Sequence, residues 1–215
     1  MSIQNNLFRC INILYYFLSP MQENRPKYRI NYINICDKKT CFGGFEGNLM
    51  IVVLAFIFLI ACYRWGAWRN WKTYYPTILF FISGDFIYLY LFSVKPLWQY
   101  TAKMMPGTIT TLIVALIIYP CTVLLFLPNY PRSGLFKKIR FVSFWVLLFS
   151  GLEYLGLKYN FMQHFHGWNF ICSVVFDCIL FPLLVIHQKK PYIAWFLAFI
   201  FCVGVLFLFQ VPAKY

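Results

Sequence analysis

Apolar and polar positions divide the chain after residue 48 into six long apolar runs separated by short polar connections. Each run approaches the ~20 residues that a helix needs to cross the hydrocarbon core of a bilayer. Prolines between the runs, as in Lys95-Pro96 and Lys190-Pro191, interrupt helices. The sequence therefore predicts an all-α, polytopic membrane protein whose six transmembrane helices cover about residues 49–67, 76–94, 108–127, 141–157, 168–186 and 192–210. Because the connections are short, neighbouring helices should run antiparallel.

The composition agrees with this pattern. Of the 215 residues, 61% are hydrophobic, 22% are aromatic and only 12% are charged. A soluble domain has roughly 25% charged residues and cannot bury so much apolar surface. The net charge of +13 does not indicate nucleic acid, because the basic residues gather in the connections between apolar runs. That arrangement orients membrane proteins and contacts anionic headgroups, so the expected partner is the lipid bilayer.

The basic residues also predict an orientation. The connections 64–75, 128–140 and 187–191 carry nine Lys and Arg residues, against four elsewhere after residue 48. Since cytoplasmic loops are enriched in Lys and Arg, these three connections should be cytoplasmic in a multi-pass protein of the cell membrane. Both termini would then lie outside. Residues 1–48 add six basic residues to the opposite side and remove the bias.

Residues 1–48 form a polar, basic tail that precedes the transmembrane domain at 49–215. The tail shows no helix or strand period, which suggests disorder. A start at Met50 would also be sensible, because Met50 opens directly into the run IVVLAFIFLI and would leave the tail outside the native sequence. Alternatively the tail is native and holds the N-terminus in the cytoplasm.

Three of the six acidic residues, Asp85, Glu153 and Asp177, lie inside apolar runs. A charged carboxylate at the centre of a bilayer costs roughly 2.5–3.5 kcal/mol, so such residues usually face a protein interior and mark functional sites. The alternative is structural. A neutral carboxyl group in an apolar site donates a hydrogen bond to a neighbouring helix and holds the bundle together.

Helical spacing connects the acids to other polar residues. His166, Asn169, Ser173 and Asp177 are separated by three, four and four positions and would line one helix face, and Ser143, Ser150 and Glu153 would line another. The first and sixth runs have no comparable stripe and should face lipid. We therefore predict a functional intramembrane polar cluster enclosed by the second, third, fourth and fifth helices, made of Asp85, Glu153, Asp177, Asn169, Ser173 and His166.

Two histidines, His164 and His166, precede the fifth run and would approach Glu153. Imidazole and carboxylate groups bind metals and move protons, so both histidines are metal candidates. H-x-H on a loop is better explained by two interfacial histidines with ordinary hydrogen bonds. We assign no metal and no cofactor from the sequence.

Two classes of function follow. The first is a small transporter or solute-binding membrane subunit, in which the intramembrane carboxylates bind a proton or a small polar or cationic solute. Such a small chain would work as a homo-oligomer or with a membrane partner. The second is a structural or accessory membrane protein, related to the envelope or to sporulation, in which the acids hydrogen-bond between helices. An enzyme is disfavoured, since no H-E-x-x-H or G-x-S-x-G motif occurs.

Three segments carry a resemblance to a known family. They are WGAWRNWKTYYPTILFFISGD, TLIVALIIYPCTVLLFLPNYP, and HGWNF followed by FPLL-x2-H-x2-KP-x3-W. Over roughly residues 50–213 the chain resembles an uncharacterised family of small multi-pass membrane proteins of endospore-forming bacteria. The resemblance implies a polytopic protein of a bacterial cell or spore membrane and brings no activity or substrate. The tail lies outside it.

Overall fold

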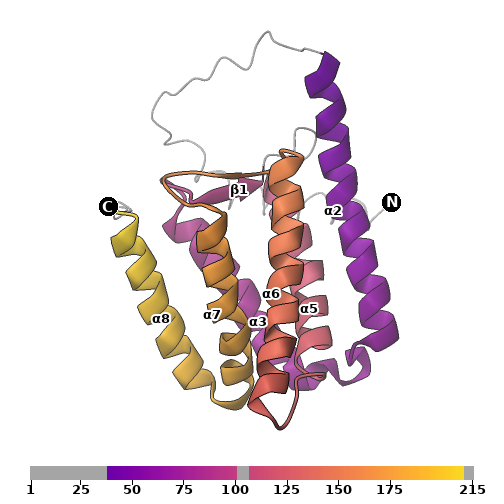
Figure 1. Cartoon of the computed structure of the whole chain (residues 1–215), viewed down its shortest axis with the longest axis vertical. Coiled ribbons are helices and arrows are strands. Elements are labelled where there is room, and N and C mark those ends of the chain that lie inside the picture. Colours follow the sequence, from indigo (N-terminus) through magenta and orange to yellow (C-terminus); the bar gives the residue numbers. More distant parts are fainter. Residues whose placement is uncertain (1–37, 101–106, 211–215) are drawn as a thin grey trace, which may run out of the picture. The chain divides into compact units, whose positions relative to one another are not determined.

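The computed structural model in Figure 1 describes residues 38–100 and 107–210. The chain divides into two units, residues 1–35 and 36–215, and all described residues belong to the second, which is considered by itself. Predictions for residues 1–37 lie outside the described residues. Within the second unit, the helices pack along their lengths and are joined by short connections.

The described residues are almost entirely helical, which confirms the all-α prediction. A continuous helical segment comprises α4 (Gly107–Ile113), the π-helix η3 (Val114–Ile118) and α5 (Tyr119–Phe126). Counting it as one, each predicted run contains one long helix. The others are α2 (Lys38–Trp65), α3 (Trp71–Leu91), α6 (Leu135–Lys158), α7 (Phe170–Lys189) and α8 (Pro191–Leu208), with the short 3-10 helix η2 (Trp68–Asn70) before α3.

By length and composition, three described helical segments are able to cross a membrane. They are Ile109–Phe126, Phe170–Lys189 and Pro191–Leu208. A fourth is added if Leu49–Trp65 and Trp68–Leu91, which meet at 86°, are counted as one bent span. The chain therefore has the character of a membrane protein with several apolar helices.

Helix boundaries differ most from the prediction at the N-terminal side of α2. This helix begins at Lys38, eleven residues before the predicted start at 49. Residues 38–48 are too polar to be recognised as part of an apolar run, but they contain no proline to interrupt the helix. Polarity therefore marks where the apolar part begins and not where the helix begins.

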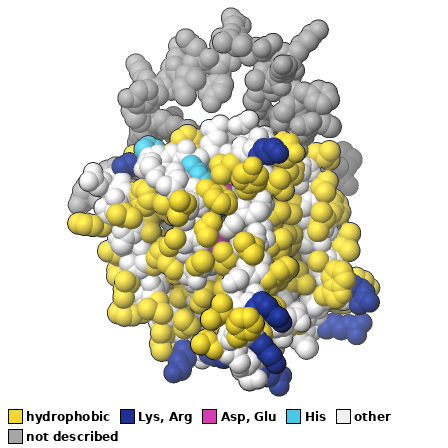
Figure 2. Space-filling view, viewed as in Figure 1, with side chains coloured by type: hydrophobic (Ala, Val, Ile, Leu, Met, Phe, Trp, Pro, Cys, Tyr) yellow, Lys and Arg dark blue, Asp and Glu magenta, His cyan; other side chains and the backbone are white. Residues whose placement is uncertain are grey.

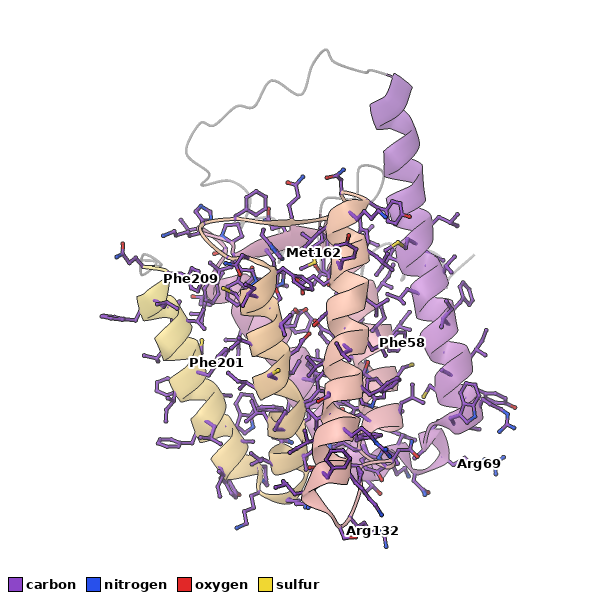
Figure 3. All side chains as sticks on the ribbon, viewed as in Figure 1. Phe58, Arg69, Arg132, Met162, Phe201 and Phe209 are labelled. Carbon is purple, nitrogen blue, oxygen red and sulfur yellow. The ribbon has the colours of Figure 1, made fainter. Side chains whose placement is uncertain are left out.

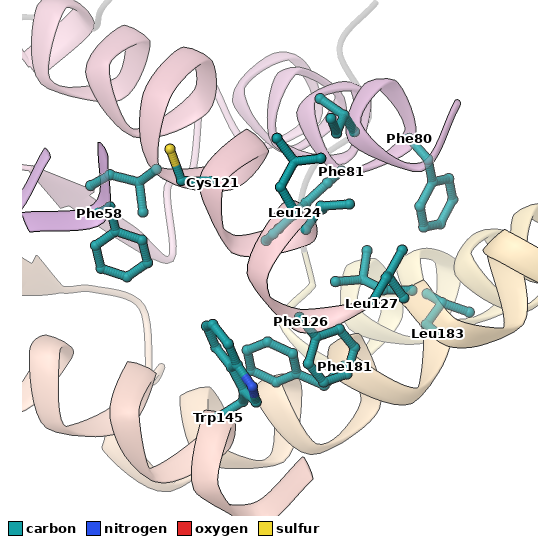
Figure 4. Packing of buried hydrophobic residues seen from close by; sticks show 14 of the residues in the cluster. Phe58, Phe80, Phe81, Cys121, Leu124, Phe126, Leu127, Trp145, Phe181 and Leu183 are labelled. Atoms are coloured by element: carbon teal, nitrogen blue, oxygen red, sulfur yellow. The ribbon is translucent and has the colours of Figure 1, made fainter. Parts of the chain in front are cut away.

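The core lies where α5, α6 and α7 meet. Phe126 and Phe181 have no exposed surface, and their ring centroids are 5.1 Å apart. The Trp145 ring meets the Phe126 ring edge-on at 5.7 Å, an arrangement that aromatic quadrupoles favour. Figure 4 shows these rings together with Leu124, Leu127 and Leu183. The aromatic contacts hold together α6 and α7, the helices that carry Glu153 and Asp177.

The three basic connections lie at one end of this unit, which we call the basic end. The Ala67 amide donates to the Leu124 carbonyl at 3.0 Å, and the Gln188 amide donates to the Thr73 carbonyl at 3.0 Å. These bonds bring the connection before α3 to the ends of α5 and α7. Figure 3 places Arg69 and Arg132 at this end, and Figure 2 shows basic side chains gathered there.

The opposite end carries a two-stranded antiparallel ribbon that the sequence did not reveal, and we call it the ribbon end. Strands β1 (Trp98–Tyr100) and β2 (Met162–His164) pair with Trp98 opposite His164. Each strand has three residues, too few to show a period of two. The ribbon joins the connection after α3 to the connection between α6 and α7.

Helix α8 lies at the margin of the bundle, as expected for the sixth run. Only 6% of its residues Pro191–Leu208 are buried within the described structure, and the buried residue is Ala194. At its C-terminal end, the Lys95 ammonium group donates to the Phe209 carbonyl at 2.7 Å. A cation there also complements the negative end of the helix dipole. The exposed apolar surface of α8 suits contact with lipid.

Candidate functional site

The ribbon positions a histidine over the end of α6. Because β2 pairs with β1, His164 lies beside Glu153, and its Nε2 atom is 2.7 Å from the Glu153 Oε1 atom. The two side chains are only 12% and 13% exposed. Among the described residues this is the one ion pair, formed when the imidazole is protonated. The pair is largely shielded from water, but it lies close to the surface at the ribbon end.

Ser173 connects this pair to α7. The Trp168 indole donates to the Ser173 hydroxyl at 2.8 Å, and the Ser173 hydroxyl lies close enough to Glu153 to stabilise the charge of its carboxyl group. Ser173 is 6% exposed. The serine therefore lies between the two helices that carry Glu153 and Asp177.

Asp177 lies one turn further along α7 and is buried, with 6% exposure. It is close enough to Glu153 and to Tyr119 for electrostatic interaction. None of the hydrogen bonds identified among the described side chains involves its carboxyl group. An ionised carboxyl group in such a place is unfavourable unless a proton or a cation compensates it.

Asp85 enters the same interior from α3. The Tyr119 hydroxyl donates to the Asp85 Oδ1 atom at 3.4 Å. The Oδ2 atom is buried and has no hydrogen-bond partner in the described part of the chain. Buried polar atoms are nearly always satisfied by protein, water or an ion, so this oxygen is a natural contact for a ligand or proton.

Tyr100, at the end of β1, lies between the acids. Burial raises the pKa of its hydroxyl, and the nearby charges of Asp85 and Glu153 raise it further. Together with the Tyr119 interactions, this makes one connected group of side chains from four helical segments and the ribbon. We call it the acidic network: Asp85, Tyr119, Asp177, Glu153, Tyr100, Ser173 and His164.

Aromatic rings line the network on its ribbon side. The Tyr88 ring stacks on the Trp98 ring with centroids 3.8 Å apart, and Trp98 contacts the Trp168 ring at 5.0 Å. The Tyr88 hydroxyl donates to the Trp98 carbonyl and accepts from the Leu97 and Trp98 amides. These bonds fix β1 against α3. In Figure 2, acidic side chains show on this face only as small points among hydrophobic ones.

The structure brings Asp85, Glu153, Asp177 and Ser173 together and places His166 and Asn169 elsewhere. Helix α7 begins at Phe170, so the predicted polar stripe is helical only from Ser173 onward. Asn169 caps this helix, its side-chain oxygen accepting from the Cys172 amide at 3.0 Å. His166 is exposed, has a positive φ of 55° and bonds through Nδ1 to the Pro96 carbonyl at 2.7 Å.

The serines of the second predicted stripe also divide. Ser150 is buried, and its hydroxyl has no hydrogen-bond partner among the described residues, whereas Ser143 is exposed. Ser150 lies one turn before Glu153 on the same helix. A second unsatisfied oxygen therefore lies on the helix that carries Glu153.

Tyr119 and Tyr100 were missed from the sequence. Tyrosines near helix ends are typical of membrane interfaces, so Tyr100 gave no sign of a site, and Tyr119 is a single uncharged residue in the middle of an apolar run. The available signal was Tyr119-Pro120 inside a long apolar run. Proline lacks the amide that would bond the Leu116 carbonyl, and the π-helix at Val114–Ile118 accommodates this gap. The Tyr119 amide bonds the Val114 carbonyl five residues back.

Metal binding by His164 and His166 is not supported by their positions, because His166 points to Pro96 and not to Glu153. Among the described residues, no group of three or more His, Cys, Asp or Glu side chains converges closely enough to hold a metal ion. The acids interact through their charges without meeting at one point. Such spacing suits a species that one carboxylate binds at a time.

Comparison with known proteins adds no assignment: no family model, no curated protein and no solved structure matches the chain.

Proposed function

We propose that the chain is a six-helix protein of a bacterial cell membrane that works as a small transporter or solute-binding subunit for protons or a small cationic solute. The acidic network carries the proposal. Three carboxyl groups from three different helices lie in one interior, and one of them keeps a buried oxygen that has no partner among the described residues. Packing alone requires no such group, and intramembrane acids are expensive to retain.

The chemistry of the network favours a positive species. Carboxyl groups in one site repel each other when ionised, and proton or cation uptake relieves that repulsion. A hydrogen bond joins His164 to Glu153, the Ser173 hydroxyl lies beside Glu153, and the charge of Asp177 interacts with that of Glu153. A proton can therefore be passed inward from the ribbon end by groups that all bind protons.

The basic connections support the proposed sidedness. With Arg69, Arg132 and their neighbours cytoplasmic, the ribbon end and its His164–Glu153 pair face outward. The outer end is then the entrance to the network. A cation arriving from outside meets Glu153 first and Asp177 and Asp85 at greater depth.

The second candidate is a structural or accessory membrane protein. It is favoured by the bonds between elements, Tyr119 to Asp85 and His164 to Glu153, which would hold the bundle together. The resemblance to membrane proteins of endospore-forming bacteria suits an envelope or sporulation role.

Neutral substitution separates the candidates. Asp177→Asn and Asp85→Asn keep the shape of the side chains but cannot bind and release a proton. The protein and its variants would be reconstituted in liposomes containing a pH-sensitive dye, and proton uptake would be driven by an imposed potential. We expect uptake by the wild-type protein and loss to the level of empty liposomes in both variants. Cys178→Ala, next to Asp177 but exposed, is the matched control and should retain uptake.

Assembly is measured alongside by gel filtration in detergent and thermal unfolding. If Asp85→Asn and Asp177→Asn fail to assemble while Cys178→Ala assembles, the acids hold the helices together and the structural candidate is preferred. If all proteins assemble and the wild type carries no protons, a thermal-shift screen against small amines decides for a cationic solute or against the proposal.

A further inference from the structure

A second buried polar cluster lies at the basic end, between α3 and α7. Thr77 and His187 are 1% and 4% exposed. The Thr77 Oγ1 atom is 2.9 Å from the His187 Nδ1 atom and donates to the Gln188 Oε1 atom at 2.8 Å. The Gln188 Nε2 atom donates in turn to the Thr73 carbonyl at 3.0 Å. A buried titratable ring is thus held by a chain of three hydrogen bonds.

These bonds determine which nitrogen of the ring carries hydrogen. The Thr73 carbonyl only accepts, so the Gln188 Nε2 group faces it and the Oε1 atom faces Thr77. A hydroxyl has one hydrogen, and Thr77 gives it to Gln188. Thr77 therefore accepts from His187, whose Nδ1 atom must carry the hydrogen. In the neutral ring, the lone pair that binds a proton is then on Nε2.

Aromatic packing holds this ring in place. The Phe80 ring stacks on the imidazole with centroids 4.2 Å apart and an interplanar angle of 17°. The Trp195 ring from α8 lies edge-on to Phe80 at 4.8 Å and 6.5 Å from the imidazole. An aromatic face also attracts a cation, which offsets part of the cost of protonating the buried ring.

His187 and the acidic network lie on the same pair of helices. Thr77 precedes Asp85 by eight residues on α3, about 12 Å of helix, and Asp177 precedes His187 by ten residues on α7, about 15 Å. The buried Phe81 and Phe181 belong to the intervening turns. The contact between α3 and α7 thus has acids at one level, a histidine at the basic end and apolar side chains between them.

We propose that His187 is a second proton-binding site, through which protons taken up by the acidic network leave at the basic end. The inference rests on the proposed function. The Nε2 lone pair accepts a proton to give the imidazolium ion and releases it unchanged, so the step needs no other reactant. Passage between the two sites requires α3 and α7 to separate around the intervening phenylalanines. The titratable or charged side chains at this end on the elements packed against α7 are Lys72, Tyr74 and Tyr75 on α3, Lys137, Lys138 and Arg140 on α6, and Lys190 and Tyr192 at the start of α8, with Lys189 on α7 itself.

The test uses His187→Asn, whose amide nitrogen replaces Nδ1 as the donor to Thr77 but cannot bind a proton. In the liposome assay we expect the wild type to carry protons and His187→Asn to fall to background, with unchanged thermal stability. Thr122→Val is the matched control, because the buried Thr122 hydroxyl bonds only the Ile118 carbonyl of its own helix. If the wild type carries no protons, the proposed function fails. If the wild type and His187→Asn carry them equally, only the present inference fails.

A measurement on the unmodified protein covers the case in which His187→Asn does not fold. The chain has three histidines, so ¹⁵N spectra of histidine-labelled protein contain few ring signals. We expect one ring with hydrogen on Nδ1 at high pH that becomes doubly protonated as the pH falls. The His164→Gln and His166→Gln variants identify the remaining signal. A His187 ring with hydrogen on Nε2, or one that never titrates, would overturn the proposal.

Discussion

Asp85 is the residue whose burial is energetically unfavourable and whose free oxygen is available to a ligand. One carboxylate oxygen accepts a long hydrogen bond from Tyr119, and the other is buried without a partner among the described residues. Leaving a buried polar group unsatisfied costs roughly 1–3 kcal/mol, and more when it is charged. A proton or ligand that binds the free oxygen would remove this unfavourable free energy. Asp85 is therefore best understood together with its ligand or proton.

A glycine on α6 determines whether the ribbon can reach the acids. A Cβ atom at Gly156 would lie 2.9 Å from the Phe161 ring and 3.3 Å from the Met162 Cβ atom. We expect Gly156→Ala to destabilise the protein by about 1–3 kcal/mol, because overpacking forces β2 away from α6. Thermal unfolding measures this effect, and proton uptake should fall as His164 leaves Glu153.

Gly151 provides the matched control on the same helix. Apart from its own helix, no described atom lies within 4 Å of the position that an alanine Cβ atom would occupy there. Gly151→Ala should be neutral or should stabilise by up to about 1 kcal/mol, because alanine favours helix. Equal effects of the two substitutions would contradict the close packing of Gly156 against the ribbon.

At the scale of elements, the sequence predicted helices well and their interruptions poorly. Long apolar runs locate a helix because the bilayer demands about 20 such residues. The ribbon has no comparable signal, since its strands are short and are paired by residues far apart in the chain. The polar stripe predicted on α7 included His166 and Asn169 because helical spacing alone does not show that the helix begins at Phe170. Asp85, Asp177 and Glu153 were recognisable from polarity alone, but Tyr119 was not.

The π-helix before Pro120 gives a prediction at this scale. Pro120→Ala restores the amide that can bond the Leu116 carbonyl and allows a regular α-helix through Val114–Ile118. A change from π-helical to α-helical winding would rotate Tyr119 relative to α4 and separate its hydroxyl from Asp85. We expect unchanged or higher thermal stability with reduced proton uptake. Retention of full uptake would show that the Tyr119–Asp85 contact is dispensable.

At the scale of the whole molecule, the distribution of charge supplies a test of topology. The connections at 64–75, 128–140 and 187–191 meet at the basic end, although they are distant in sequence. Reporter fusions that are active on only one side of the membrane, placed after Ser133 and after Gln163, would measure sidedness. We expect the fusion after Ser133 to report the cytoplasm and the fusion after Gln163 to report the outside.

A reversed result would invert the orientation and would make the basic end the entrance to the network. Identical sides for both fusions would contradict a crossing by α6, whose two ends lie near these positions. Either outcome leaves the geometry of the acidic network unchanged. The direction of movement depends on the orientation, whereas the proton-binding groups do not.

The ribbon has a mechanical consequence for any such movement. It fastens the end of α3 to the connection between α6 and α7, and the Tyr88 hydroxyl and the Phe165–Leu97 backbone bond reinforce it. Helices tied at one end separate most easily at the other, as the arms of a hinge do. At the basic end, α3 and α7 are joined by the hydrogen bonds among Thr77, His187 and Gln188 and by the Phe80 ring stacked on His187. Separation of α3 and α7 at this end would break these hydrogen bonds. A proton that binds His187 therefore acts on a residue that itself holds the two helices together.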